Sequence, residues 1–196
     1  MSYPQTAPPQ GGTHPGVPGT RRAAAPPRRP GLVVAMLVTA VLAALSGAIG
    51  SMLVFVGGKD LADENVRKAV DNDPSAVGLP SGTTAADIEK LSGTMWDDVV
   101  TEWQGTMSAR ATIALVFAVA LLLFALLARN GAVWARVMIT IVALLAAAFP
   151  HALILRDAAP SGLYMTSIAA ILLGLLALVM CWLPPVGRYK KALRNS

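Results

Sequence analysis

The stretch LVVAMLVTAVLAALSGAIGSMLVFVG, residues 32–57, decides the fold of this chain. It has 26 residues, and none of them is charged. An α-helix rises 1.5 Å per residue, so a helix of this length spans about 39 Å, more than the roughly 30 Å of a bilayer's hydrocarbon core. The stretch therefore predicts a membrane-spanning helix that crosses the bilayer with some tilt.

Three further apolar runs occupy residues 111–128, 137–155 and 163–183, with 18, 19 and 21 residues. Each is close to the roughly 20 residues that a spanning helix needs. Because lipid offers no hydrogen-bond partners, such a segment must satisfy its own backbone as a helix. The predicted fold class is all-α: a four-helix transmembrane bundle with a helical extracytoplasmic segment between helices 1 and 2.

The remaining residues form two tails, two short turns and one polar segment. Residues 1–31 contain eight prolines and five glycines, which predicts a disordered Pro-rich cytoplasmic tail. A cytoplasmic turn is expected at residues 129–136, an extracytoplasmic turn at 156–162, and a basic cytoplasmic tail at 184–196. Residues 58–110 are the only sizeable polar region between spans, and we expect an extracytoplasmic helical cap there.

Three helices are predicted within this cap. KDLADENVRKAVDND, residues 59–73, carries a mostly apolar stripe, and TTAADIEKL, residues 83–91, offers Thr84 as a helix N-cap. TMWDDVVTEWQGTM, residues 94–107, is the most strongly amphipathic segment, with Thr94 as its expected N-cap. The stripe of the first helix consists of Leu61, Asn65, Val66, Ala69 and Val70, and that of the third consists of Trp96, Val99, Val100, Trp103 and Met107.

Two placements of the third cap helix are open. We expect it to lie in the outer membrane interface, because indole rings favour the headgroup level, where the ring and its N–H group are both accommodated. The alternative is that its stripe packs against Leu61, Val66 and Val70 to form the core of a self-contained cap.

Basic residues divide unequally between the two sides that four spans create. The tails and the turn at residues 129–136 carry ten Lys or Arg and no acidic residue, whereas the other side carries six Lys or Arg and all eleven acidic residues. The positive-inside rule then predicts that both termini are cytoplasmic. Arg28 and Arg29 become topology determinants that face anionic headgroups, and the span that follows them is expected to be an uncleaved anchor.

The composition restricts the classes of protein that fit. The chain is 55% hydrophobic and 14% charged, whereas soluble domains have about 25% charged residues. Its one cysteine, Cys181, excludes an intrachain disulfide and a cysteine-based zinc cluster. The net charge of +5 arises from the tails and the cytoplasmic turn, which predicts contact with lipid headgroups and not with nucleic acid. No catalytic residue, cofactor-binding residue or metal ligand is predicted.

His151 is the one ionisable side chain predicted inside a span. It directly follows Pro150, which is expected to kink the third span. Because Arg156 lies only five residues further on, the favoured interpretation is a neutral histidine that is packed or interfacial near the outer surface. A proton- or ligand-sensing role is the alternative.

The first span carries two lines of small residues at four-residue spacing. Small side chains allow helix backbones to approach closely. We expect these lines to pack within the bundle, and dimerisation is the alternative, which leaves a homo-oligomer open. The lines consist of Ala40, Ala44 and Ala48, and of Ala43, Gly47 and Ser51.

The order of segments, together with the turn sequence RNGAVWARVMIT at residues 129–140, resembles small four-span integral membrane proteins of actinobacterial type. Ala132 stands where a further basic residue is more typical of that turn. The resemblance implies a multi-pass protein of the cell (plasma) membrane and no catalytic residues, because the group is largely of unknown function.

These observations predict a non-enzymatic multi-pass membrane protein that acts as a scaffold or sensor through its cap. The chain places most of its residues outside the spans in the cap and the tails, which are the surfaces that an adaptor needs. A subunit of an oligomeric channel or transporter is the alternative, and a membrane enzyme is the third reading. Neither is favoured, because the spans show no acidic residue and no continuous polar stripe.

Overall fold

The computed structural model describes residues 31–129, 132–157 and 159–184. Within these ranges every regular element is a helix, so the predicted all-α class is confirmed. The predicted tails at residues 1–31 and 184–196 lie almost wholly outside the described residues. The elements are α1 (Gly31–Asn72), η1 (Pro74–Val77), α2 (Ala85–Ser92), α3 (Thr94–Ala128), α4 (Val133–Ala146), η2 (Ala147–His151), α5 (Ala152–Arg156) and α6 (Ser161–Trp182).

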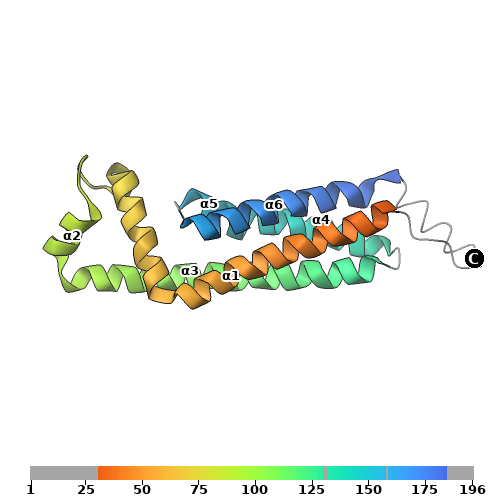
Figure 1. Cartoon of the computed structure of the whole chain (residues 1–196), viewed down its shortest axis with the longest axis horizontal. Helices are drawn as coiled ribbons and strands as arrows, with labels where there is room; N and C mark the ends of the chain where they lie inside the picture. The colour runs from red at the N-terminus through yellow and green to blue at the C-terminus, as the bar shows by residue number, and fades with distance from the viewer. Residues whose placement is uncertain (1–30, 130–131, 158, 185–196) are drawn as a thin grey trace, which may run out of the picture.

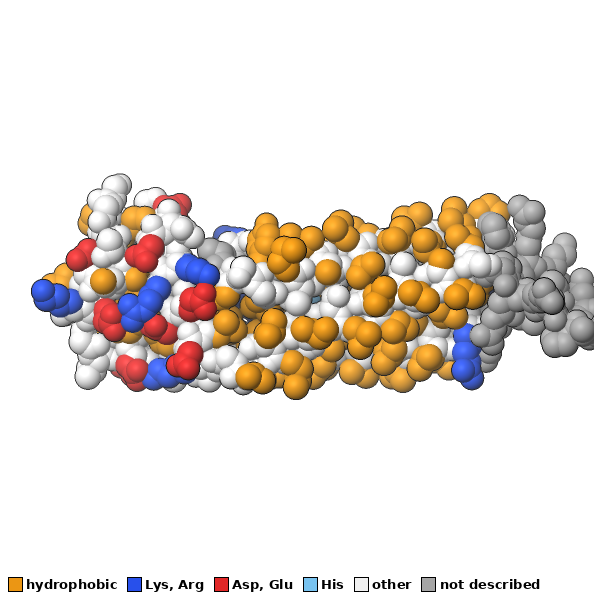
Figure 2. All heavy atoms as spheres, in the orientation of Figure 1, with side chains coloured by type: hydrophobic (Ala, Val, Ile, Leu, Met, Phe, Trp, Pro, Cys, Tyr) orange, Lys and Arg blue, Asp and Glu red, His pale blue; other side chains and the backbone are white. Residues whose placement is uncertain are grey.

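Four helical segments are long and apolar enough to cross a membrane, as predicted. They are α1, α3, the continuous run from α4 through η2 to α5, and α6. Figure 1 shows their apolar portions side by side as an elongated bundle. Figure 2 shows hydrophobic side chains over the outside of this bundle. Val56, Val116 and Leu172 are among the exposed hydrophobic residues, which is typical of a surface that contacts lipid.

Helix α1 bends sharply at Gly58 and thereby leaves the bundle (Figure 1). The backbone there has φ 49° and ψ −128°, a conformation that glycine adopts far more easily than residues with a Cβ atom. The first part of α1 lies in the bundle, and the part after Gly58 lies in the cap. We use the name cap for α1 after Gly58, η1, α2 and α3 up to Arg110.

Helix α3 passes from the cap into the bundle without interruption, so the last predicted cap helix and the second span are one helix of 35 residues. Charged side chains gather on the cap end of the molecule (Figure 2). The cap helix α2 begins as predicted, because Thr84 and Asp87 form a reciprocal capping box. The predicted N-cap at Thr94 is wrong: the preceding Gly93, with φ 53°, occupies the cap position without a side-chain hydrogen bond.

The third span starts earlier than predicted. Helix α4 begins at Val133, so Arg136, expected in a cytoplasmic turn, is helical and buried. The predicted distortion at Pro150 is present as the π-helical turn η2, where proline supplies no backbone N–H for the regular ladder.

Small residues of α1 are packed inside the bundle, which confirms the favoured prediction for them. Ala40, Ala43, Ala44, Gly47 and Ser51 are buried, whereas Ala48 is only partly buried. A Cβ atom added to the neighbouring Gly50 would lie 2.9 Å from Oγ1 of Thr166 on α6, so this glycine permits the close approach of two helices.

Candidate functional site

The cap is held together by an ionic and aromatic cluster that joins α1, α2 and α3. The carboxylate of Asp63 accepts hydrogen bonds from Nε1 of Trp96 at 2.8 Å and from Nε of Arg67 at 2.6 Å. The same guanidinium donates to Glu89 of α2 at 3.0 Å and lies 5.2 Å from the centre of the Trp96 ring. One arginine thus connects three helices.

The contacts in this cluster shift the pKa values of Asp63 and Arg67. Partial burial by itself raises the pKa of Asp63, but the hydrogen bonds from Arg67 and Trp96 and the positive charge of Arg67 outweigh it, so that the pKa lies below its usual range. Hydrogen bonds to Glu89 and Asp63 raise the pKa of Arg67. Both groups are therefore charged at neutral pH.

Most of the amphipathic stripe of α3 packs inside the molecule, although Val99 is half exposed. Trp96, Val100 and Met107 are buried in one cluster with Val70 of α1, which is the alternative placement. Few apolar side chains in the cap are large enough to cover two indoles. Instead, the guanidinium groups of Arg67 and Arg110 cover them.

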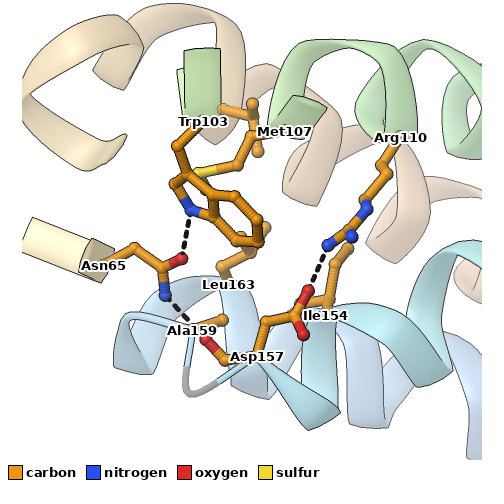
Figure 3. Close-up of a pocket in the computed structure, with 9 residues that line it drawn as sticks. Asn65, Trp103, Met107, Arg110, Ile154, Asp157, Ala159 and Leu163 are labelled. Carbon is orange, nitrogen blue, oxygen red and sulfur yellow. Dashed lines mark hydrogen bonds and ion pairs between the residues drawn. The ribbon is translucent and has the colours of Figure 1, made fainter. Parts of the chain in front are cut away.

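A second polar cluster joins the cap to the bundle (Figure 3). The side-chain oxygen of Asn65 accepts a hydrogen bond from Nε1 of Trp103 at 2.6 Å, and its amide nitrogen donates to the backbone carbonyl of Asp157 at 2.9 Å. Arg110 forms an ion pair with the Asp157 carboxylate, and its guanidinium lies 5.2 Å from the centre of the Trp103 ring. We call Asn65, Trp103, Arg110 and Asp157 the junction.

The junction attaches the segment between α5 and α6 to the cap. Asp157 directly follows α5, while Asn65 belongs to α1 and Arg110 and Trp103 belong to α3. A void of about 20 Å³ lies among these side chains, which is room for about one water molecule. The junction is thus densely packed, and it holds the residue that follows α5 against α1 and α3.

A larger opening lies beside the junction, between α1 and α3. It has a volume of about 360 Å³. Small-molecule sites typically have 300–1,000 Å³ and combine apolar walls with a few polar groups. We call this opening the groove. Its lining consists of Asn65, Val66, Ala69, Val70, Val77, Val99, Glu102, Trp103 and Thr106.

Two residues belong to both the groove and the junction. Asn65 and Trp103 line the groove and also form the hydrogen bond that leads to Asp157. Asn65 is 2% exposed, although asparagine is a polar residue in a stripe of otherwise apolar side chains. A polar residue within an apolar stripe is the sequence signal for this site, although no role for Asn65 is predicted from the sequence.

His151 lies inside the bundle, not at an interface. It is buried, with Nδ1 3.4 Å from Oγ of Ser167 on α6. A Cβ atom on Gly47 would lie 3.6 Å from its Nε2 atom. Voids of about 20 and about 10 Å³ adjoin the ring, each no larger than a water molecule. Of the two interpretations, this placement supports a packed histidine.

Cys181 is also buried, in the core of the bundle with Met36 and Ile139. Among the described residues, no three histidine, cysteine or acidic side chains are grouped closely enough to hold a metal ion. The candidate site is therefore the groove with its junction, and its chemistry is that of binding by apolar contact, hydrogen bonds and charge.

Comparison with known proteins adds no relative to this description. No family model, no curated protein and no solved structure matches the chain.

Proposed function

We propose that this chain is a non-enzymatic sensor located in the plasma membrane. It binds a small ligand in the groove of its cap, and this binding changes the conformation of its bundle. The four apolar helices make it compatible with a multi-pass membrane protein whose bundle contacts the lipid bilayer. The sensor role is supported by one observation above all: the groove and the junction share Asn65 and Trp103.

The shared residues give binding a physical route to the bundle. A ligand can shift a conformational equilibrium only through contacts that differ between two states. A ligand in the groove would contact Trp103 and Asn65, and any change in their hydrogen bond would alter the support of Asp157 at the end of α5. The α5–α6 turn is therefore the element expected to respond.

The packing of the described helices leaves little room for a pore within a single chain. The polar side chains His151, Ser51 and Ser167 are buried in its interior, yet the voids beside them hold no more than a single water. The hydroxyl of Ser51 donates to the carbonyls of Gly47 and Ala111 at 3.0 and 2.9 Å, which ties α1 to α3. These groups contribute to helix packing.

The proposed orientation places the cap outside the cell and both termini in the cytoplasm. The tails and the turn at residues 129–136 carry ten Lys or Arg, whereas the segments on the other side carry six. The basic tails would then lie against anionic headgroups of the cytoplasmic leaflet. In this orientation the groove is open to ligands that reach the outer surface of the membrane.

Filling the groove with a side chain tests the sensor proposal without knowledge of the ligand. Val99 lies in the groove and is half exposed, so Val99→Trp should occupy part of the groove without entering the core. Hydrogen–deuterium exchange of the protein in nanodiscs should then change at residues 152–157, which are α5 and the first residue of the α5–α6 turn. The control is Val116→Trp, at an exposed position of α3 in the bundle.

The expected result is a change of at least threefold in exchange rate at residues 152–157 for Val99→Trp and no change there for Val116→Trp. Thermal unfolding of both variants shows that each is folded. If the folded Val99→Trp protein exchanges at these residues at the rate of the unsubstituted chain, the groove is not coupled to the bundle, and the sensor proposal is overturned.

A further inference from the structure

The groove differs from the dense junction beside it in both size and lining. Its walls are formed by valine side chains of α1, η1 and α3, among them Val66, Val77 and Val99. Trp103 and Asn65 contribute the polar atoms at the junction side, and Glu102 and Thr106 contribute those along α3. An apolar wall with a few polar groups is the arrangement that binds a small amphipathic molecule.

Glu102 gives this groove its charge. Its side chain is exposed and lines the groove, and its carboxylate forms no hydrogen bond or ion pair with any residue that the structure describes. Thr106, one turn further along α3, directs its hydroxyl to the backbone carbonyl of Glu102 at 3.3 Å. The carboxylate is therefore available to a ligand.

The positive charges near the groove are neutralised by partners. Arg67 pairs with Asp63 and Glu89, and Lys68 pairs with Glu64 at 2.7 Å. Arg110, which covers one face of Trp103, pairs with Asp157. Near the groove, the carboxylate of Glu102 is thus a negative charge without a matching positive one.

The net charge of the whole cap is also negative, which favours a cationic ligand. Residues 58–110 contain ten acidic and five basic residues, a net charge of −5. A surface with one predominant sign of charge raises the local concentration of ligands of the opposite sign and speeds their association. An apolar groove on such a surface selects molecules that combine an apolar body with a positive group.

We infer that the groove binds small organic cations with an apolar body, whose ammonium group pairs with Glu102 and whose apolar part lies along Val66, Val70 and Val99. This inference rests on the proposed function, because it names the ligand class of the same groove. The volume of about 360 Å³ limits the occupant to a small molecule.

Three probes of similar size and different charge test the inference. They are 4-phenylbutylammonium, the neutral 4-phenylbutanol and the anionic 4-phenylbutyrate, each titrated calorimetrically into the full chain in phosphatidylcholine nanodiscs. Empty nanodiscs supply the correction for partition into lipid. The expected order of affinity is the ammonium first, the alcohol second and the carboxylate last, and the preference for the ammonium should shrink in high salt.

Two substitutions locate the binding. Glu102→Gln keeps the shape of the side chain but removes its charge, so the Kd of the ammonium should rise about fivefold, as for an exposed ion pair, while that of the alcohol stays constant. Asp98→Asn is the matched control, because Asp98 is an exposed carboxylate of α3 that does not line the groove. Val99→Trp should weaken binding of all three probes.

Several outcomes overturn the inference. Equal affinity for the ammonium and the alcohol would indicate a groove for neutral apolar molecules. Equal effects of Glu102→Gln and Asp98→Asn on the Kd of the ammonium would show that Glu102 does not bind it. The third outcome is the absence of binding. None of these outcomes affects the exchange experiment with Val99→Trp, so this inference and the sensor proposal fail separately.

Discussion

The indole N–H group of Trp103 donates a hydrogen bond to the side-chain oxygen of Asn65 across 2.6 Å, and the amide nitrogen of Asn65 donates to the backbone carbonyl of Asp157. These residues belong to α3, to α1 and to the end of α5. Asn65 therefore satisfies a donor and an acceptor on two different elements, in a place where water has little access.

Replacing Asn65 should destabilise the contact between cap and bundle. Asn65→Ala leaves the Trp103 N–H and the Asp157 carbonyl without this partner, and each buried unsatisfied group costs about 1–3 kcal/mol. The free energy of unfolding, followed by tryptophan fluorescence in nanodiscs, should fall by at least about 1 kcal/mol. Asn72→Ala, at an exposed position near the end of α1, should change it by less than about 0.5 kcal/mol. Equal effects would contradict a specific role for Asn65.

Acid should weaken the cap through Asp63. Because the folded-state pKa of Asp63 lies below its ordinary value of 3.8, its contribution to stability is complete above that pH and is lost as the pH falls through the folded value. The lowered pKa values of Asp73 and Asp87, caused first by hydrogen bonds from Ser75 and Thr84, act in the same direction. We expect the cap to unfold at lower urea concentration at pH 3 than at pH 6.

The test uses a chain with Trp134→Phe and Trp182→Phe, so that fluorescence reports only the two cap tryptophans. In this background Asp63→Asn should reduce the difference between pH 3 and pH 6, because its amide does not titrate. Asp98→Asn should leave the difference unchanged. An undiminished difference in Asp63→Asn would show that other groups control the acid response.

The four spans and the start of α2 could be predicted from sequence because their causes are local. A long uncharged run has only one way to satisfy its backbone in lipid, and this rule identifies all four spanning helices. The start of α2 follows from Thr84 and Asp87, which are three residues apart. The start of α3 was wrong because Gly93 shapes the turn by its backbone conformation, and a side-chain cap at Thr94 is not needed.

The candidate site could not be predicted because its contacts join distant parts of the chain. The hydrogen bond from Asn65 to Asp157 connects residues 92 positions apart. The covering of Trp96 by Arg67 joins α3 to the part of α1 that follows the bend at Gly58. Periodicity identifies which residues share a face of a helix, but it does not specify which face of another helix they meet.

The bend in α1 depends on Gly58. A residue with a Cβ atom in this positive-φ conformation costs roughly 1–3 kcal/mol, so Gly58→Ala should lower the free energy of unfolding by about that amount. Gly105→Ala is the matched control, because Gly105 is helical and a Cβ atom there meets no other atom within 4 Å. The control should stabilise the protein by up to about 1 kcal/mol. A neutral or stabilising Gly58→Ala would show that the bend does not need glycine.

The close approach of α1 and α6 at Gly50 should be sensitive to a single methyl group. A Cβ atom there would lie 2.9 Å from Oγ1 of Thr166, so Gly50→Ala should cost about 1–3 kcal/mol by overpacking. Thr166→Ala removes the clashing oxygen, and the double variant should recover most of that loss. Thermal unfolding of the two single variants and the double variant measures the coupling. Strictly additive effects would contradict a direct contact.

The orientation in the membrane can be tested with single cysteines in a Cys181→Ala background. Positions Gly12, Ser81 and Ser196 represent the two tails and the cap. If the ten basic residues of the tails and the turn determine the topology, a thiol reagent that cannot cross the membrane should label intact cells only at the Ser81→Cys position. Permeabilised cells should be labelled at all three positions, which controls for the reactivity of each cysteine. Labelling of either tail in intact cells would reverse the orientation and place the groove in the cytoplasm, where its ligand would have to be sought instead.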